Sequence, residues 1–405
     1  MMKRGVLMSG ILSLLLLTGP AFGQNYEQIA KQIVNTSAGV KPGELVVITG
    51  GQHTLPLMEA VAVEVTRAGG QATMMLGTDK VARAELMEMP ESAIQADKTN
   101  NWLLQADVLI TLPQYEDGRA VMAGVSPARM AKFSQVAAAS GLTEKLDASK
   151  LRGVFVSYPN KSFAAAQQLD YPSYEQMVWG GIGADYAAIA GQAERLKQTL
   201  ATGKKMRITS PAGTDLTLEL GGRPVFTDDG VVSAADQQEK LIYNRTAALP
   251  GGRIYGTCQE TSGTGRLAAA NDYISDGKPL TGFKADLKSG QLANVRADAG
   301  ADAFQQQMAP YGPTAMQITN FSIGLNPVMK PQSDKSYNPN TAAGMVYLRT
   351  GNNSLLGGTN KSPGGYSFPI ANATVEVDGK VLVRNGQLVS TAVASTAPAP
   401  KKSRK

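Results

Sequence analysis

Short apolar runs and helical patterns alternate through the first half of this 405-residue chain. Residues 45–48, 108–110 and 154–156 form continuous apolar runs of the length typical of strands buried on both faces. A helical pattern fills residues 54–68, and another fills residues 185–200. Strand, turn, helix and strand again predict an α/β domain built on a doubly wound, mostly parallel sheet.

The pattern changes after about residue 203. Paired runs of alternating apolar and polar residues flank turn sequences at 206–220 and 374–383, and such pairs predict β-hairpins. A helical pattern in this half covers residues 302–308. We therefore expect a C-terminal domain that is mainly antiparallel β, of the α+β type.

The two ends of the chain differ from the rest. The start carries Lys3 and Arg4, continues with an apolar run and ends in Ala21-Phe22-Gly23, a pattern typical of a cleaved export signal. An uncleaved anchor is the alternative, but the run is shorter than the roughly 20 residues that span a bilayer. The last residues, 390–405, are rich in Ala, Pro and Ser and end in Lys and Arg.

These features divide the chain into four parts. We expect a signal peptide at 1–23, an N-terminal α/β domain at 24–203, a C-terminal β-rich domain at 204–389 and a disordered basic tail at 390–405. The mature protein is then periplasmic or secreted, with no membrane segment left after signal cleavage.

The net charge of +6 does not indicate a nucleic-acid partner. Its excess comes from the basic residues near the two ends, and the body between them is neutral. A protein that binds nucleic acid through a groove carries a basic stripe on its folded surface. We therefore expect no nucleic-acid partner.

One histidine and one cysteine exclude several kinds of site. A disulfide framework and a four-ligand zinc site both need more residues than His53 and Cys258 supply. A Cys or Ser nucleophile would need an adjacent base, and the pattern shows none. Gly50-Gly51 before His53 does not match the G-x-G-x-x-G spacing, so a plain strand-to-helix turn is favoured over a nucleotide site.

Carboxylates remain as candidate catalytic groups. Asp228, Asp229, Glu260 and Asp272 all fall in loop-rich segments of the second half. Chemistry based on two carboxylates needs a pair placed across the substrate, and the sequence does not place them. Solvated surface acids are the alternative.

Five strings in order resemble the aminopeptidase T family. They are Val40-Lys-Pro-Gly-Glu44 before residues 45–48, Thr209-Ser-Pro-Ala-Gly-Thr-Asp-Leu-Thr217, Leu249-Pro-Gly-Gly252, Ile323-Gly-Leu-Asn-Pro327 and Val375-Glu-Val-Asp-Gly379. The resemblance runs from about Tyr26 to Val389. It implies a two-domain metallo-aminopeptidase, usually a homodimer, whose C-terminal domain holds two divalent metal ions between carboxylates and imidazoles.

The sequence departs from the family at the metal-site positions. Where the family has Pro-Gly-Gly-Glu, this chain has Arg253 after its glycines. The positions that match the six metal-site residues of the family are Arg253, Asn320, Tyr347, Ser354, Tyr366 and Phe368. No carboxylate or imidazole is left among them, so we expect no dinuclear metal centre and no metal cofactor.

These departures predict a retained scaffold with an altered site. The leading hypothesis is a non-catalytic or altered family member whose six replaced positions bind a peptide-like or small anionic molecule. Arg253 would donate hydrogen bonds to the anion. A structural alternative pairs Arg253 with Glu260 or Asp272.

Two further alternatives stay open. One is an active exported aminopeptidase with a rearranged site that uses acids such as Asp228, Asp229 or Glu260. The other is an interaction protein that acts through a dimer surface and the basic tail.

Overall fold

The computed structural model describes residues 25–95, 102–274, 278–332, 334 and 336–389. The predicted signal peptide and the predicted tail lie outside these residues. No helix in the described ranges is both long enough and apolar enough to cross a membrane.

The first half supplies four of the five strands of sheet A, and β8 from the second half adds the fifth; all are parallel to their neighbours. Its strand order is β2 (Gln71–Gly77), β1 (Leu45–Gly51), β3 (Val108–Thr111), β4 (Arg152–Val156) and β8 (Thr246–Leu249). The three predicted strands are confirmed as β1, β3 and β4. Their core residues, such as Val46, Ile48 and Ile110, are fully buried, as a strand covered on both faces requires.

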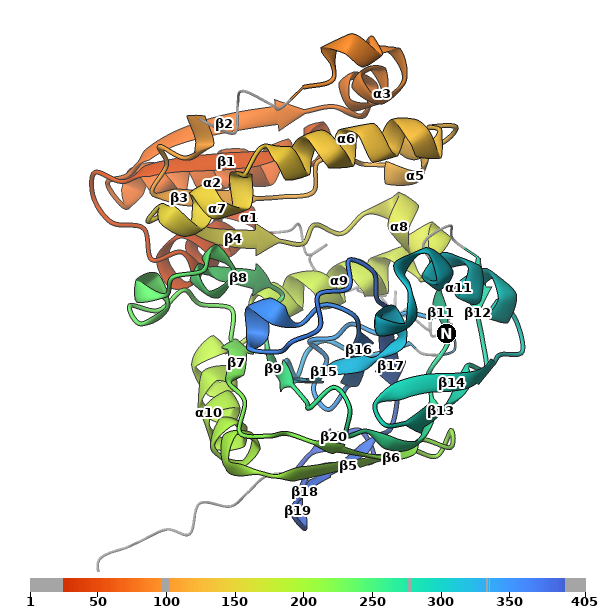
Figure 1. The fold of residues 1–405 in the computed structure, drawn as a ribbon. Coiled ribbons are helices and arrows are strands. Elements are labelled where there is room, and N and C mark those ends of the chain that lie inside the picture. The colour runs from red at the N-terminus through yellow and green to blue at the C-terminus, as the bar shows by residue number, and fades with distance from the viewer. Residues whose placement is uncertain (1–24, 96–101, 275–277, 333, 335, 390–405) are drawn as a thin grey trace, which may run out of the picture.

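Helices cover both faces of sheet A (Figure 1). Helices α1 (Tyr26–Lys31) and α2 (Leu55–Arg67) lie on one side, and α6 (Pro127–Ala139) and α7 (Leu142–Ala148) lie on the other. The predicted helix at 54–68 is therefore confirmed. The remaining helices of this half are α3 (Asp79–Glu88), α5 (Gly118–Met122), α8 (Lys161–Ala166), α9 (Tyr171–Ile182) and α10 (Tyr186–Thr202).

Helix α10 begins where the sequence predicts it. Its N-cap is Asp185, whose side chain accepts a hydrogen bond from the Ala188 amide at 2.9 Å. Ile189, Ala193, Leu196 and Leu200 form its buried face at helical spacing.

The second half forms two antiparallel sheets. Sheet B has the order β14 (Gln291–Arg296), β13 (Lys284–Lys288), β10 (Thr264–Ala268), β6 (Asp215–Glu219), β5 (Lys205–Thr209), β18 (Thr374–Val377), β19 (Lys380–Arg384) and β20 (Gln387–Leu388). Both predicted hairpins are present here as β5–β6 and β18–β19. The predicted helix is α11 (Ala301–Met308), and β11 (Asp272–Tyr273) and β12 (Pro279–Leu280) form a separate pair.

Sheet C lies in the interior of the second half and carries four of the six positions matched to the metal site of the family. Its order is β17 (Ser367–Ile370), β16 (Val346–Thr350), β15 (Ile318–Gly324), β9 (Arg253–Thr257) and β7 (Val225–Asp228). Successive side chains of a strand point to opposite faces. One face buries Ile254, Phe321 and Leu348 in the core, and the other face carries Arg253 and Tyr347.

The chain passes from sheet C to sheet A and back within about thirty residues. Strand β7 belongs to sheet C, β8 adds to the edge of sheet A beside β4, and β9 returns to sheet C. The loop Pro250-Gly251-Gly252 makes the second crossing. This crossing brings the carboxyl ends of the parallel strands next to the first residue of β9, which is Arg253.

Candidate functional site

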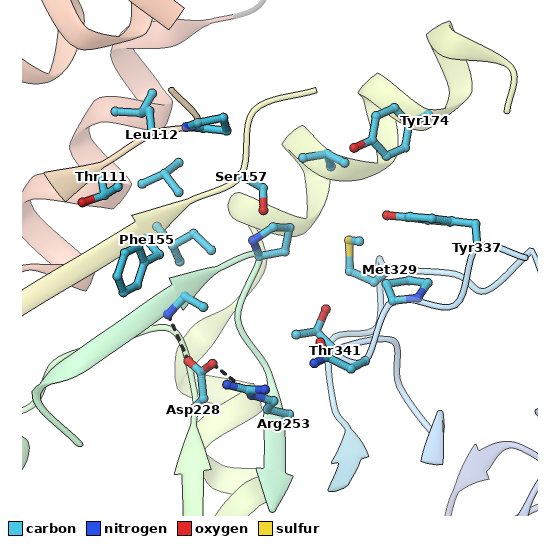
Figure 2. Close-up of a pocket in the computed structure, with 18 of the residues that line it drawn as sticks. Thr111, Leu112, Phe155, Ser157, Tyr174, Asp228, Arg253, Met329, Tyr337 and Thr341 are labelled. Atoms are coloured by element: carbon cyan, nitrogen blue, oxygen red, sulfur yellow. Dashed lines mark hydrogen bonds and ion pairs between the residues drawn. The ribbon is translucent and has the colours of Figure 1, made fainter. Parts of the chain in front are cut away.

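A cavity of about 730 Å³ lies between the two halves of the molecule. It opens at the carboxyl ends of β3, β4 and β8, which is where open α/β sheets bind their ligands. The opposite wall comes from the second half, with Met329 and the loop at residues 337–341 (Figure 2). Its size falls within the range of small-molecule sites.

Arg253 and Asp228 form an ion pair at this cavity. Arg253 Nε donates to Asp228 Oδ2 at 3.2 Å, and Figure 2 shows the two side chains facing each other below the cavity. The two residues are opposite each other on the adjacent strands β9 and β7. Asp228 Oδ1 also accepts from the Ala248 amide at 3.2 Å, so the carboxylate joins β7, β8 and β9.

Both oxygens of the Asp228 carboxylate accept hydrogen bonds, and the side chain is buried. Its side chain is 6% exposed, whereas that of Arg253 is 24% exposed. The Arg253 guanidinium also lies over the Tyr255 ring, 5.1 Å from the ring centroid. Burial alone would lower the pKa of Arg253, but the Asp228 carboxylate outweighs this effect and raises it. Arg253 is therefore a fixed positive charge held from two sides.

The two terminal nitrogens of Arg253 are left for a ligand. Within the described residues, Nε donates to Asp228, and neither Nη1 nor Nη2 has a hydrogen-bond partner. A guanidinium with both terminal nitrogens open matches the two oxygens of a carboxylate. The geometry supports binding of a small anion at this point.

The ion pair of Arg253 differs from the alternative expected from the sequence. That alternative named Glu260 or Asp272 as its partner, and the structure shows Asp228 instead. Burial raises the pKa of the Asp272 carboxyl and outweighs the opposing effects of the Tyr273 amide and the Tyr366 side chain. The expectation fails because the partner is set by the pairing of β7 with β9, which the sequence pattern does not reveal.

Glu260 is held in a separate polar cluster. It accepts hydrogen bonds from Arg223 Nη2 at 2.6 Å, Asn353 Nδ2 at 2.9 Å and the Thr359 amide at 2.7 Å. Burial raises the pKa of Glu260, but these hydrogen bonds, led by that of Arg223, outweigh burial and hold the pKa well below its ordinary range. Glu260 therefore anchors the segment around residues 353–360 and does not line the cavity.

Replacing this carboxylate should destabilise the protein in a pH-dependent way. Glu260→Gln leaves Arg223 without its charge partner, and we expect a loss of about 3 kcal/mol at pH 7. Because the folded pKa is lowered, the stabilisation is fully present above the unfolded pKa of roughly 4.3 and is lost progressively as the pH falls from there through the lowered folded pKa. Urea unfolding at pH 7 and at pH 3.5 should show a large difference from the natural protein that shrinks in acid.

A matched control is the exposed pair of Arg207 and Asp215. Their side chains are 56% and 49% exposed, so Asp215→Asn should leave the unfolding midpoint almost unchanged. An equal effect of the two substitutions, or a difference that does not depend on pH, would contradict the role given to Glu260.

The structure separates the six positions matched to the metal site of the family. Arg253 lines the cavity, and the other five do not. Asn320 shares the face of sheet C that carries Arg253, but the strand register places it four residues further along, about 13 Å away at 3.3 Å per residue. Its Nδ2 donates to the Asn352 carbonyl at 3.5 Å, and its Oδ1 is buried with no partner in the described residues.

Ser354 and Tyr347 are engaged in loop contacts. Ser354 begins a short 3₁₀ turn and donates from Oγ to Asn352 Oδ1 at 2.9 Å. The Tyr347 hydroxyl donates to the carbonyl of Asn338. That carbonyl belongs to the loop that forms one wall of the cavity, so Tyr347 supports the wall from behind.

Tyr366 and Phe368 belong to an aromatic cluster in the core. The Phe368 ring is fully buried, 4.8 Å from the Phe283 centroid and 5.0 Å from that of Tyr366. Phe368 pairs with Leu348 and shares its core face of sheet C, so it faces away from Arg253. The Tyr366 hydroxyl donates to the Tyr273 carbonyl at 3.2 Å.

The residues at these positions do not fit two divalent metal ions. Such ions in a peptidase bind carboxylates and imidazoles, and the six side chains supply a guanidinium, an amide, three hydroxyls and a hydrocarbon ring. In the ranges that the structure describes, no group of three or more His, Cys, Asp or Glu side chains could hold a metal ion.

The remaining sequence candidates, His53, the Gly50-Gly51 turn and Cys258, are packed parts of the fold. The His53 ring packs edge to face against Tyr158, with ring centroids 5.7 Å apart, and burial lowers the pKa of its imidazole. A Cβ atom at Gly51 would lie 2.4 Å from the Gln114 carbonyl, so close packing explains this glycine without a phosphate. Cys258 is fully buried, and burial raises the pKa of its thiol to about 12.

Sequence reasoning missed two parts of this site. The first is β8, a strand of four residues that ends at Leu249, the start of one family string. Nothing in the local sequence pattern indicates that β8 pairs with β4. The second is Asp228, which we considered as a catalytic acid and which instead orients Arg253. The adjacent Asp229 accepts from the Val231 amide at 3.2 Å, and burial raises the pKa of its carboxyl.

Comparisons with known proteins identify relatives of the chain and of its fold. The model of the thermophilic metalloprotease (M29) family matches residues 22–326. Wild-type AmpT from Thermus thermophilus is 17% identical, with a TM-score of 0.73 over 91% of this chain and 100% of that chain. The 2,5-dihydroxypyridine dioxygenase from Pseudomonas putida KT2440 is 16% identical, with a TM-score of 0.55 over 94% of this chain and 97% of that chain. No curated protein matches.

Proposed function

Because this chain belongs to the M29 family of thermophilic metalloproteases, the aminopeptidase T family, we propose that it is an exported member with an altered site. It binds a small anionic or peptide-like molecule at Arg253, in the cavity between the two halves, and it does not use the dinuclear metal chemistry of the family.

One observation carries this proposal. By the family resemblance, the position of a metal-binding carboxylate holds Arg253, which lines a cavity of about 730 Å³ and whose terminal nitrogens have no hydrogen-bond partner among the described residues. A guanidinium repels a dication, and at 4 Å with an effective dielectric constant near 20 each unit-charge pair is worth about 4 kcal/mol. The same charge attracts a carboxylate. Arg253 therefore favours an anion where the family favours a metal ion.

The remaining parts of the proposal rest on the sequence. The basic start, apolar run and Ala21-Phe22-Gly23 support export to the periplasm or outside the cell, with the signal peptide removed. The neutral charge of the body opposes a nucleic-acid partner. By family resemblance the protein is a homodimer.

Metal content and peptidase activity test the proposal directly. Mass spectrometry of the purified protein should find no stoichiometric metal, and aminoacyl substrates should not be cleaved with or without added Co²⁺ or Zn²⁺. About two metal ions per chain with metal-dependent turnover would refute the proposal and establish the alternative, an active exported aminopeptidase with a rearranged site.

Substitution of Arg253 tests the anion site. Arg253→Gln keeps a polar side chain but removes the charge, and we expect the affinity for a bound carboxylate to fall at least 30-fold, which corresponds to about 2 kcal/mol. Titration calorimetry with benzoate and with the dipeptide Ala-Phe measures this. Arg207→Gln removes an arginine from an exposed pair on sheet B and should leave the affinity unchanged. Failure of every carboxylate to bind the natural protein would refute the site.

A further inference from the structure

Phe155 is an unusual residue on the floor of the cavity. It lies on β4, an interior strand of sheet A, yet it is 54% exposed. Its neighbours across the two adjacent strands are Thr111 and Ala248, which are small and also line the cavity. A flat aromatic ring is therefore left bare between two short side chains.

The rest of that sheet face is covered, which makes the exposure local. Further from the strand ends, Val47 is fully buried and Leu109 packs against it, together with Leu146 of α7. This cluster does not include Phe155. Exposure of a large apolar side chain inside a concave site is typical of a surface that a ligand covers.

Phe155 and Arg253 are linked through a short chain of contacts. Phe155 is paired with Ala248 on the next strand, and the Ala248 amide donates to Asp228 at 3.2 Å. Asp228 in turn accepts a hydrogen bond from Arg253 Nε at 3.2 Å. Adjacent strands are about 4.8 Å apart. Figure 2 shows Phe155 on one side of Asp228 and Arg253 on the other, and all three residues line the cavity.

The opposite wall adds aromatic surface without negative charge. Tyr337 on this wall meets Tyr174 of α9 edge to face, with ring centroids 5.6 Å apart, and both residues line the cavity. Burial raises the pKa of Tyr174 to about 12 and raises that of Tyr337 further. Both phenols are neutral at physiological pH and do not repel an anion.

We propose that the cavity binds a planar aromatic monocarboxylate, with its carboxylate on the two terminal nitrogens of Arg253 and its ring against Phe155. This assignment rests on the proposed function, because it uses the same anion site and adds the class of ligand. Charge-assisted bidentate hydrogen bonds select the carboxylate, and stacking of flat rings selects the aromatic body.

Titration calorimetry on the full protein with three small probes separates these two contributions. Benzoate carries both groups, cyclohexanecarboxylate keeps the charge but is not flat, and benzamide is flat but uncharged. We expect cyclohexanecarboxylate to bind at least 5-fold more weakly than benzoate, and benzamide at least 10-fold more weakly.

A substitution at the ring position links the preference to the residue. Phe155→Leu alters an exposed side chain, so the variant should fold, and the ratio of benzoate to cyclohexanecarboxylate affinity should fall to near one. The matched control is Phe133→Leu on α6, outside the cavity, which should keep the natural ratio.

The outcomes distinguish the two proposals. If no carboxylate binds, the proposed function and this assignment both fail. If benzoate and cyclohexanecarboxylate bind equally to the natural protein, the aromatic assignment fails while the anion site stands. If benzamide binds as well as benzoate, the ring is recognised without Arg253 and the assignment is overturned. A preference for benzoate that Phe155→Leu leaves intact also overturns the stacking on Phe155.

Discussion

Arg245→Met is expected to destabilise the protein by at least about 4 kcal/mol. The Arg245 side chain is buried, and its three nitrogens donate to five main-chain carbonyls. The acceptors, with distances of 2.7 to 3.0 Å, are those of Leu146, Ser149, Leu151, Glu239 and Lys240. Each buried carbonyl left without a donor costs roughly 1–3 kcal/mol. Methionine fills part of the space but donates nothing.

The reason for so large an effect is the position of Arg245 at the start of β8. It connects the segment before β8 to the end of α7 and the start of β4, and so fixes the last strand of sheet A. Urea unfolding measures the loss. Arg195→Met, on the exposed side of α10, is the matched control and should leave the unfolding midpoint almost unchanged. A loss below 1 kcal/mol for Arg245→Met would show that water or rearranged donors satisfy these carbonyls.

Asn326→Ala is expected to cost about 4 kcal/mol. Asn326 is fully buried, and its Nδ2 donates to the carbonyls of Gly181 at 3.0 Å and Gly251 at 2.8 Å. Its Oδ1 accepts from the amides of Val328 at 3.0 Å and Met329 at 3.4 Å. Alanine leaves four main-chain polar groups, three of them in buried hydrogen bonds, without this partner, and each net hydrogen bond contributes about 1 kcal/mol.

This substitution should also disturb the cavity, because Asn326 holds two of its walls. Pro250 and Met329 both line the cavity and adjoin groups that Asn326 binds. We expect benzoate affinity to fall together with stability, as measured by calorimetry and urea unfolding. Asn244→Ala, which loses a side-chain hydrogen bond to Glu239, is the control. Natural stability in Asn326→Ala would contradict the role of this residue as a crosslink.

The elements with a strong local pattern could be predicted from the sequence. The apolar runs of β1, β3 and β4 are continuous, and the burial of α10 follows its helical period, so both were recognised without tertiary information. Strand β8 is different, because four residues give too short a pattern and its place in sheet A depends on the distant contacts of Arg245.

The site was predictable only in part, for a similar reason. The family resemblance led to Arg253, and the structure places it at the cavity. It also matched the strings around Gly251 and Asn326, which the structure shows in direct contact. The ion pair with Asp228 and the bare ring of Phe155 depend on which strands are neighbours. Strand neighbours are a property of the whole fold, so no local pattern contains them.

The interleaving of β7, β8 and β9 between two sheets has a consequence for synthesis of the chain. Residues up to Thr202 complete four strands of sheet A, but the edge of β4 stays unpaired until residues 246–249 have been made. A nascent chain emerges from its N-terminus, and unpaired strand edges favour aggregation. The sheet of the first half therefore remains incomplete on the ribosome until well over half of the chain has been made.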